Sequence, residues 1–209
     1  HYHIEGGYEN HQQLVFSPNT VTQFNQLTHD RLDTPMEPYP LKKVEIPSAD
    51  LGNRGLLFAG IGWYTRLEFP YLNNIMEQGE YVHIEKAGLK IYPEYGTYSD
   101  FNALPDSIFL YIADENNVVT DAVKDYLGKQ VQGGKLVKDD LFLGNTYYYF
   151  DVTQFMKEEL GASGKYKHNL QLVFNSDDYT KTLKNLTFSA PNGQNPIILQ
   201  LNYKIYESY

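Results

Sequence analysis

The sequence predicts an all-β sandwich, and three observations support this prediction. Aromatic and β-branched residues favour strands, and the chain has 19 tyrosines and 11 phenylalanines among 209 residues. Several segments alternate apolar and polar side chains with the period of two that indicates a half-buried strand. Glycine, asparagine and aspartate separate these segments, as in the turns of antiparallel sheets. The length suits one large β domain, with residues 1–55 packing on a core of residues 56–209.

Composition and charge exclude some classes of function. The formal net charge of -9 argues against nucleic acid as a partner, because a phosphate binder needs clustered lysine and arginine. No apolar run approaches the roughly 18 residues of a membrane-spanning helix. Cysteine is absent, which excludes thiol chemistry. The chain starts with neither a methionine nor a signal-peptide pattern, so we interpret it as a fragment of a longer chain whose targeting segment lies upstream.

The first 55 residues show the least regular pattern. Residues 1–4 alternate like the middle of a strand, which indicates an edge strand that lacks its neighbour. Because such an edge tends to recruit a second copy, we expect either disorder at residues 1–7 or weak self-association. Residues 30–48 contain four prolines and predict an extended connector, with an edge strand at most at residues 44–46.

Strand signals become regular from residue 56. Residues 56–69 alternate as one strand and place Trp63 on the core face. Residues 71–78 predict a short helix that ends at a glycine. Within residues 81–92 the apolar residues change parity, and we therefore expect a β-bulge or break at Glu85–Lys86.

The second half of the chain continues the alternation. Residues 121–127 predict a second helix, ended by glycine, and Gly133-Gly134 predicts a hairpin turn. The polar tetrapeptides at residues 114–117 and 175–178 predict loops. The closing strand is expected to be internal, because both of its faces carry large side chains. Half-buried strands are predicted at residues 108–112, 170–174 and 197–205.

The segment FDVTQFM, which begins at Phe150, predicts a strand that passes into a helix. Asp151 can accept hydrogen bonds from the first-turn amides, and Gln154 stands where a capping box has Glu or Gln. Gly161 is expected to end the helix. One apolar stripe predicts that this helix covers an open end of the core: Val152, Phe155, Met156 and Leu160.

This strand-DVT-helix element resembles the DVT signature of DNRLRE domains, which are jelly-roll domains of bacterial cell-surface and fibre-associated proteins. Other pieces of those domains are similar to segments of this chain in the same order. They are TRLEFPYL (residues 65–72), EKAGLKIYP (85–93), SIFLYIADE (107–115) and FSAPNGQNPIILQLNY (188–203).

A closer resemblance is to a family of uncharacterised secreted lipoproteins of Gram-negative gut commensals, in which the same pieces form the C-terminal part of a longer chain. QFNQLTHD (residues 23–30) is similar to the F-N-x-x-x-H-D element of that family, and GIGWYTRLEFPYL (60–72) to its glycine-rich strand. The resemblance covers residues 20–205. It implies a jelly-roll β-sandwich of two antiparallel sheets with two or three short helices. It also implies export to the cell surface or outer membrane, with a lipid anchor on an absent N-terminus, and no active site.

Metal and acid–base candidates are few. His29 and Asp30 are adjacent but lack a partner at ligand spacing, and we interpret them as a hydrogen-bonded pair that holds a loop. His1 and His3 have the spacing for one strand face, but we interpret this as incidental. The oxygens of residues 114–117 and 175–178 suit Ca²⁺ without matching a known calcium loop, so we expect no cofactor.

Aromatic residues provide the one functional indication. Sugar rings stack on exposed aromatic faces, and Tyr92, Tyr95 and Tyr98 lie in the loop sequence YPEYGTY. Packing of these tyrosines on a long connector is the alternative. We expect a non-catalytic module that binds a polysaccharide or a surface protein. A structural module that supports the missing N-terminal part and a glycoside hydrolase with a carboxylate pair are the other hypotheses.

Overall fold

The computed structural model divides the chain into two compact units, residues 1–30 and residues 31–209. In the first unit, strand β1 (Tyr2–His3) pairs antiparallel with β2 (Glu9–Asn10). The predicted disorder or self-pairing of residues 1–7 falls mostly outside the residues that the structure describes. Those residues are 2–3, 9–10, 28, 30–40, 45–79, 81–125, 127–139, 145–163, 168–189 and 196–206.

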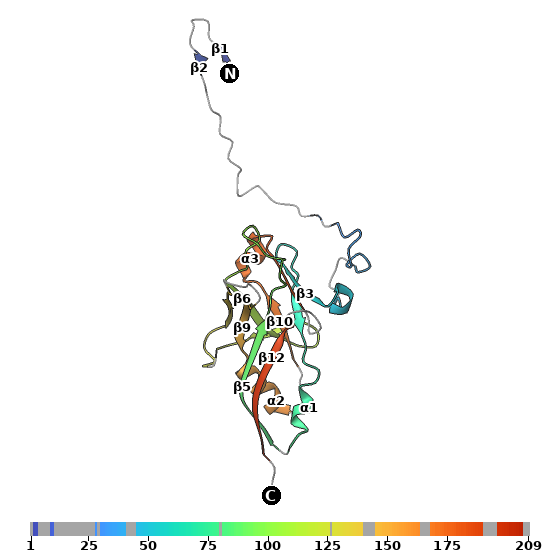
Figure 1. The fold of residues 1–209 in the computed structure, drawn as a ribbon, viewed down its shortest axis with the longest axis vertical. Helices are drawn as coiled ribbons and strands as arrows, with labels where there is room; N and C mark the ends of the chain where they lie inside the picture. Colours follow the sequence, from blue (N-terminus) through green and yellow to red (C-terminus); the bar gives the residue numbers. More distant parts are fainter. Residues whose placement is uncertain are drawn as a thin grey trace. The chain divides into compact units, whose positions relative to one another are not determined.

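The second unit is an all-β sandwich of antiparallel strands, which confirms the predicted fold class (Figure 1). A ribbon of β3 (Arg54–Phe58) and β11 (Asn185–Ser189) forms one sheet. The other sheet is curled and has the strand order β12-β5-β9-β8-β6-β10-β4, with β7 paired to β6. Its strands are β4 (Thr65–Leu67), β5 (Tyr81–Ile91), β6 (Ser107–Ala113), β7 (Val119–Ala122), β8 (Gly133–Val137), β9 (Tyr147–Asp151), β10 (Asn169–Val173) and β12 (Ile198–Tyr206).

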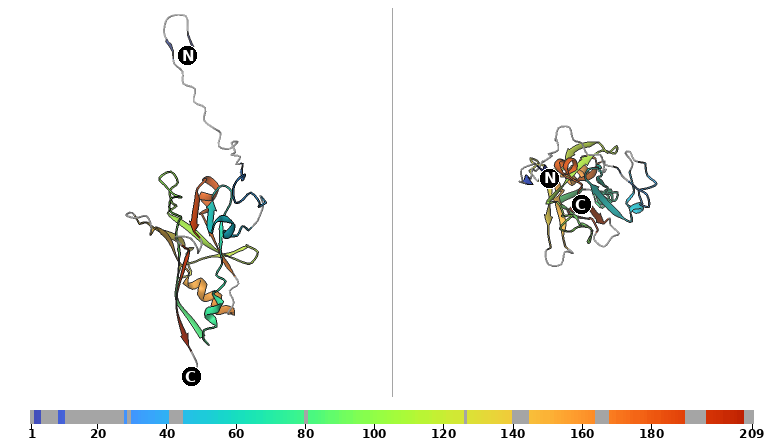
Figure 2. Two further views of the ribbon diagram at one scale, coloured as in Figure 1. Left: turned by 45° about the vertical axis from the view of Figure 1, so that its right-hand side comes forward. Right: turned by 90° about the horizontal axis from the view of Figure 1, so that it is seen from above.

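Early strands pair with late strands throughout this unit. β3 pairs with β11, β4 with β10 and β5 with β12, so segments from the two ends of the unit lie side by side. Short helices complete the fold: the 3-10 helix η1 (Ser48–Leu51), α1 (Asn73–Met76), α2 (Thr153–Ser163) and α3 (Ser176–Lys181). Helices α1 and α2 lie side by side at one end of the sandwich, and α3 lies at the other (Figure 1, Figure 2). No helix in the described part of the chain has both the length and the apolar run of a membrane span.

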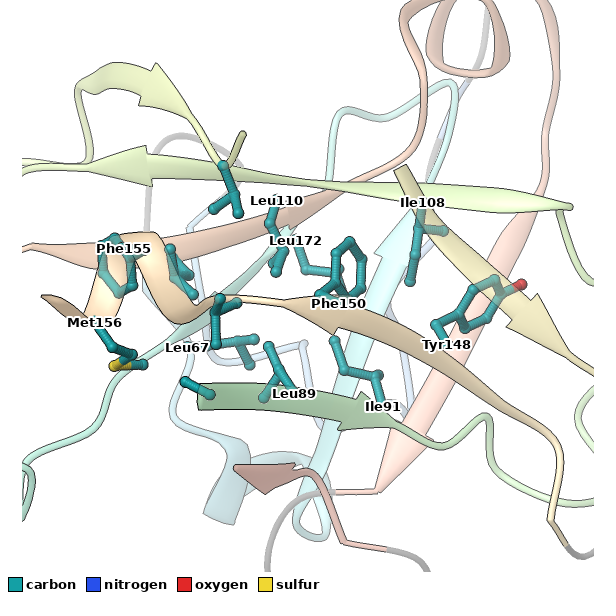
Figure 3. Close-up of a cluster of buried hydrophobic side chains, with 14 of the residues drawn as sticks. Leu67, Leu89, Ile91, Ile108, Leu110, Tyr148, Phe150, Phe155, Met156 and Leu172 are labelled. Atoms are coloured by element: carbon teal, nitrogen blue, oxygen red, sulfur yellow. The ribbon is translucent and has the colours of Figure 1, made fainter. Parts of the chain in front are cut away.

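The core contains the apolar positions that the alternation predicted. Side chains from β5, β6, β9 and β10 meet between the sheets, and the ribbon contributes Leu57, Leu186 and Phe188. At one end of this core, α2 adds Phe155 and Met156, as its apolar stripe predicts (Figure 3). The largest fully buried side chains are Tyr148, Phe150, Phe174, Phe188, Leu57, Leu89, Ile91, Ile108, Leu110, Met156, Leu170 and Leu172.

The predicted bulge in β5 is confirmed. Against β12, Lys86 pairs with Asn202 and Ile84 pairs with Tyr203, so Glu85 is the extra residue. The burial pattern of β5 changes parity at this point. The extra residue therefore lets apolar side chains on both sides of it face the core.

The FDVTQFM segment connects β9 to α2 through an exchange of hydrogen bonds with β5. The Asp151 carboxylate accepts from the Thr153 amide at 3.0 Å, so this side chain caps the helix although the residue itself still belongs to β9. The Val152 amide donates to the Ala87 carbonyl at 3.0 Å, and the Ala87 amide donates to the Thr153 hydroxyl at 2.9 Å. The DVT sequence thus continues the β5 pairing into the first turn of the helix.

Two details of the predicted helix are wrong. Gln154 donates to the Glu158 carboxylate, one turn ahead, and its described hydrogen bond does not close a capping box. Gly161 lies inside α2, which extends to Ser163, and is not among the residues with positive φ. Packing of α2 on the core therefore carries the helix past its glycine.

The predicted hairpin turn at Gly133-Gly134 is wrong, because both glycines belong to β8. Gly134 pairs with Ile108 of β6. A Cβ atom added to Gly134 would lie 2.1 Å from Cζ of Phe150, so this glycine allows close approach of a buried ring. The dipeptide is therefore a packing feature of a strand.

The predicted helix at residues 121–127 is also wrong. β7 occupies its first part, and Asp121 pairs with Ile112 of β6. The Asp125 carboxylate then accepts from the Lys129 amide at 2.9 Å, and Gly128 adopts φ 69 in the resulting turn. Strand pairing with β6 prevails over a local pattern that only resembles a helix.

The predicted loop at residues 175–178 is helix α3. The Asn175 side chain accepts from the Asp178 amide at 2.7 Å and caps the helix. Residues 114–117 do form a loop, as predicted, in which the Asp114 carboxylate accepts from the amides of Asn116 and Val118.

Two further predictions are corrected by glycine and proline geometry. The single strand predicted for residues 56–69 is two strands, because Gly60 and Gly62 adopt φ 78 and 74 in the turn between them. Trp63 follows that turn and is half-buried. The connector predicted as extended contains successive turns at residues 31–39, with Pro35 inside the turn from Thr34 to Glu37. Residues 45–47 form no strand, and residue 44 lies outside the described residues.

The closing strand β12 is an edge strand and not internal. It is the last member of the strand order, and its even-numbered side chains, which face away from the core, are exposed. Large side chains on both faces therefore did not indicate a central position.

Candidate aromatic loop at the end of strand β5

The candidate site is the loop of residues 92–102, which leaves the end of β5 and which we call the aromatic loop. Its first residues add to the β3–β11 ribbon. Pro93 forms a bridge with Phe188, and the Glu94 amide donates to the Thr187 carbonyl at 2.8 Å. The aromatic loop therefore starts from a defined position on the sandwich.

A charged pair strengthens this attachment. The Arg54 guanidinium of β3 donates through Nε to Glu94 Oε2 at 2.8 Å and through Nη2 to Oε1 at 2.9 Å. These hydrogen bonds, followed by the charge of Glu94, raise the pKa of Arg54. The two-point geometry holds the orientation of both side chains, although solvent screening reduces its contribution to stability.

Hydrogen bonds inside the loop hold its shape. The Thr97 hydroxyl donates to the Glu94 carbonyl at 2.7 Å, across Gly96 at φ 84. The Asn102 side-chain amide donates to the Thr97 carbonyl at 3.1 Å and to the Asn185 side chain of β11 at 3.2 Å. The aromatic loop is thus attached to the ribbon near both of its ends.

The structure exposes only part of the predicted tyrosine set. Tyr95 is 65% exposed, whereas Tyr92 and Tyr98 are half-buried. Tyr92 packs against Tyr147 of β9, with ring centroids 5.4 Å apart and planes at 47°. Tyr92 is therefore engaged in packing, and Tyr95 is the predicted residue whose ring is available to a ligand.

Sequence reasoning missed Phe101, which is fully exposed in the same loop. An exposed phenylalanine leaves apolar surface in water, and a ligand that covers this surface gains hydrophobic free energy. The available signal was its position between Asp100 and Asn102, outside any alternating segment. Tyr95 and Phe101 are the two freely accessible rings of the aromatic loop.

The other predicted candidates do not form a site in the described residues. His1 and His29 lie outside those residues, and the described part of the chain has no group of three or more potential metal ligands. In the 114–117 loop, Asp114 binds backbone amides and Asn117 accepts from Arg66 at 3.1 Å. These oxygens are engaged by the protein and do not converge on a cation.

A hollow of about 420 Å³ between β7 and α2 is the second candidate. Phe155 contributes to the apolar lining of this hollow, and charged side chains also line the hollow. Lys124 donates to Asp121 at 2.7 Å and lowers the pKa of that carboxyl, and Glu158 accepts from Gln154. Because the carboxylates of Asp121 and Glu158 already have hydrogen-bond partners, this hollow is a weaker candidate for ligand binding than the aromatic loop.

In comparisons with known proteins, no family model, curated protein or solved structure matches the chain.

Proposed function

We propose that this chain is a non-catalytic module that binds a neutral polysaccharide through the aromatic loop. The observation that carries the proposal is the pair of exposed rings, Tyr95 and Phe101, on a loop that is attached to the β3–β11 ribbon. Aromatic faces have a negative quadrupole and stack on the C–H faces of sugar rings. A loop that is ordered before binding loses little conformational entropy when the sugar arrives.

Charge favours a neutral glycan over an acidic one. The net charge of -9 repels uronic acid or sulfate groups, and the Arg54 guanidinium beside the loop is already paired with Glu94. The Asn102 amide already donates to Thr97 and Asn185, whereas Asp100 is exposed beside Phe101, and its carboxylate oxygens are polar groups that can accept from sugar hydroxyls. We therefore expect stacking to provide most of the affinity and these polar groups to orient the sugar.

The binding role is favoured over hydrolysis by the polar groups in the interior. Among the described residues, the buried polar side chains are Thr146, Asn169 and Gln171, and none of them is a carboxylate. A glycosidase needs two carboxyl groups facing one substrate, at least one of them with a pKa raised by its surroundings. The resemblance to secreted lipoproteins supports a location at the cell surface, where polysaccharides are available.

Affinity electrophoresis against immobilised neutral and acidic polysaccharides tests the proposal. We expect retardation by at least one neutral polysaccharide. The double substitution Tyr95→Ala and Phe101→Ala should weaken binding about 5- to 150-fold if each ring contributes about 0.5–1.5 kcal/mol. Tyr71→Ala is the matched control, because Tyr71 is 78% exposed but lies outside the aromatic loop. Binding only to acidic polymers, no binding, or an equal loss in the control would refute the proposal.

A further inference from the structure

Strand β12 presents a continuous free edge. It pairs with β5 from Ile198 to Tyr206 and has no strand on its other side within the described part of the chain. The bulge residue of this pair lies on β5, so β12 itself is regular over nine residues. This edge therefore has nine consecutive residues without a bulge of its own, which is long enough to accept another strand.

The direction of the free backbone groups follows from the contacts of Ala87. Its amide donates to Thr153 and its carbonyl accepts from Val152, so both groups point toward α2 and away from β12. Ala87 and its partner Leu201 thus form a non-hydrogen-bonded pair of the antiparallel ladder. The amide and carbonyl of Leu201 must then point outward, to the free edge.

Alternation extends this result along the strand. Backbone groups two residues apart point the same way, so the outward groups belong to Leu199, Leu201, Tyr203 and Ile205. The even-numbered residues direct their backbone groups to β5. The free edge therefore offers a row of alternating donors and acceptors.

We propose that β12 pairs antiparallel with β12 of a second copy, about a two-fold axis that passes through Asn202. This register joins all nine residues. Leu201 then exchanges hydrogen bonds with Tyr203 of the second copy, and Leu199 does so with Ile205. These are the residues whose backbone groups point outward, and in each pair both side chains lie on the same face of the sheet.

The side chains of β12 are self-complementary in this register. Lys204, the only charged residue of the strand, faces Gln200 of the second copy, whereas parallel in-register pairing would bring Lys204 against its own copy. At the ends of the strand, Ile198 faces Tyr206. These side chains are 36% and 50% exposed, and pairing covers apolar surface on both. This register places no like charges opposite each other and covers apolar side chains at both ends, and these two features are the reason to assign the edge to a second copy of this chain.

The contact is expected to be weak. One pair of edge strands covers less than the roughly 1,200 Å² of a stable interface, so association should depend on concentration. The inference is independent of the proposed glycan site, which lies in a loop at the end of β5.

Cysteine cross-linking of the full chain tests the register, because the chain has no cysteine of its own. Asn202→Cys places two thiols on the axis, in a non-hydrogen-bonded pair whose Cα atoms are about 4.5 Å apart, within disulfide range. Gln200→Cys is the matched control, because its Cα lies more than about 7 Å from its own copy in this register. We expect oxidation to give a covalent dimer of the Asn202 variant and little of the control. Equal yields of dimer would overturn the proposal.

Sedimentation equilibrium tests the charge argument. Gln200→Lys places a lysine against Lys204 at two symmetric positions, and association should weaken about 2- to 30-fold. The double substitution Gln200→Lys and Lys204→Gln removes both clashes and should restore most of the association, although it also removes the ion pair between Lys204 and Glu85 of β5. Both positions are exposed, and circular dichroism should show folded protein in every case. A strictly monomeric wild type, or a double variant as weak as the single one, would overturn the proposal.

Discussion

The neighbouring glycines of β8 provide a sharp test of the fold, because only one of them is in contact with a buried ring. A Cβ atom on Gly134 would lie 2.1 Å from Cζ and 2.4 Å from Cε2 of Phe150. Phe150 is 0% exposed, so its ring has no free space into which it can move. On Gly133, the nearest atoms would be 3.4 Å away, on Phe109 and Ser107, which is ordinary contact.

The expected effects of alanine therefore differ in sign. Overpacking of a core costs about 1–3 kcal/mol, and we expect Gly134→Ala to lower the free energy of unfolding by that amount. Neither glycine has a positive φ, so Gly133→Ala should be neutral or should stabilise by up to about 1 kcal/mol through a less flexible unfolded chain. The two variants should then differ by about 1–4 kcal/mol.

Urea denaturation monitored by circular dichroism measures both free energies. Adding Phe150→Leu, which removes the ring, to Gly134→Ala should make the alanine less costly than it is in the wild-type background. If these glycines formed a two-residue hairpin turn, Gly133 would need positive φ in either favoured turn type and Gly134 in type I′, so Gly133→Ala would be costly. Equal losses for the two variants would therefore refute the assignment of this dipeptide to a strand.

Two other predictions concern stability. Asp151→Ala should lower the free energy of unfolding by about 1 kcal/mol through loss of the hydrogen bond to the Thr153 amide. Phe155→Ala should lower it by about 3–5 kcal/mol, because it leaves a cavity in the core. Chemical denaturation measures both, and equal, negligible losses would contradict this prediction. Burial raises the pKa of Tyr179 to about 12, so the unfolded chain loses this proton first and stability should fall as pH rises from about 10 to 12, by up to about 1.4 kcal/mol per pH unit. Alkaline denaturation should show a shallower fall in Tyr179→Phe, and an unchanged slope would exclude this group as a cause.

The candidate site was only partly predictable. The loop sequence YPEYGTY indicated exposed aromatics, and Tyr95 is exposed, but Tyr92 packs on Tyr147 of β9, 55 positions along the chain. Phe101 lies in an irregular segment, where side-chain direction depends on hydrogen bonds such as the one between Asn102 and Asn185. Exposure in a loop is determined by these distant contacts, and local pattern does not encode them.

The sequence by itself determined those elements in which the spacing of apolar residues matches a single buried face of a strand or helix. The change of parity in β5 predicted the bulge at Glu85, and the apolar stripe after Asp151 predicted the buried face of α2, because a side chain on the wrong face would lose its burial. Tertiary structure decided the rest. The Gly133-Gly134 dipeptide is a strand because Phe150 needs the space, residues 119–122 are a strand because β6 offers a partner, and β12 is an edge because strand order depends on pairings between residues far apart in the chain. Such pairings depend on the free energy of the whole core. A short segment contributes only a small part of that free energy, so its sequence does not predict them.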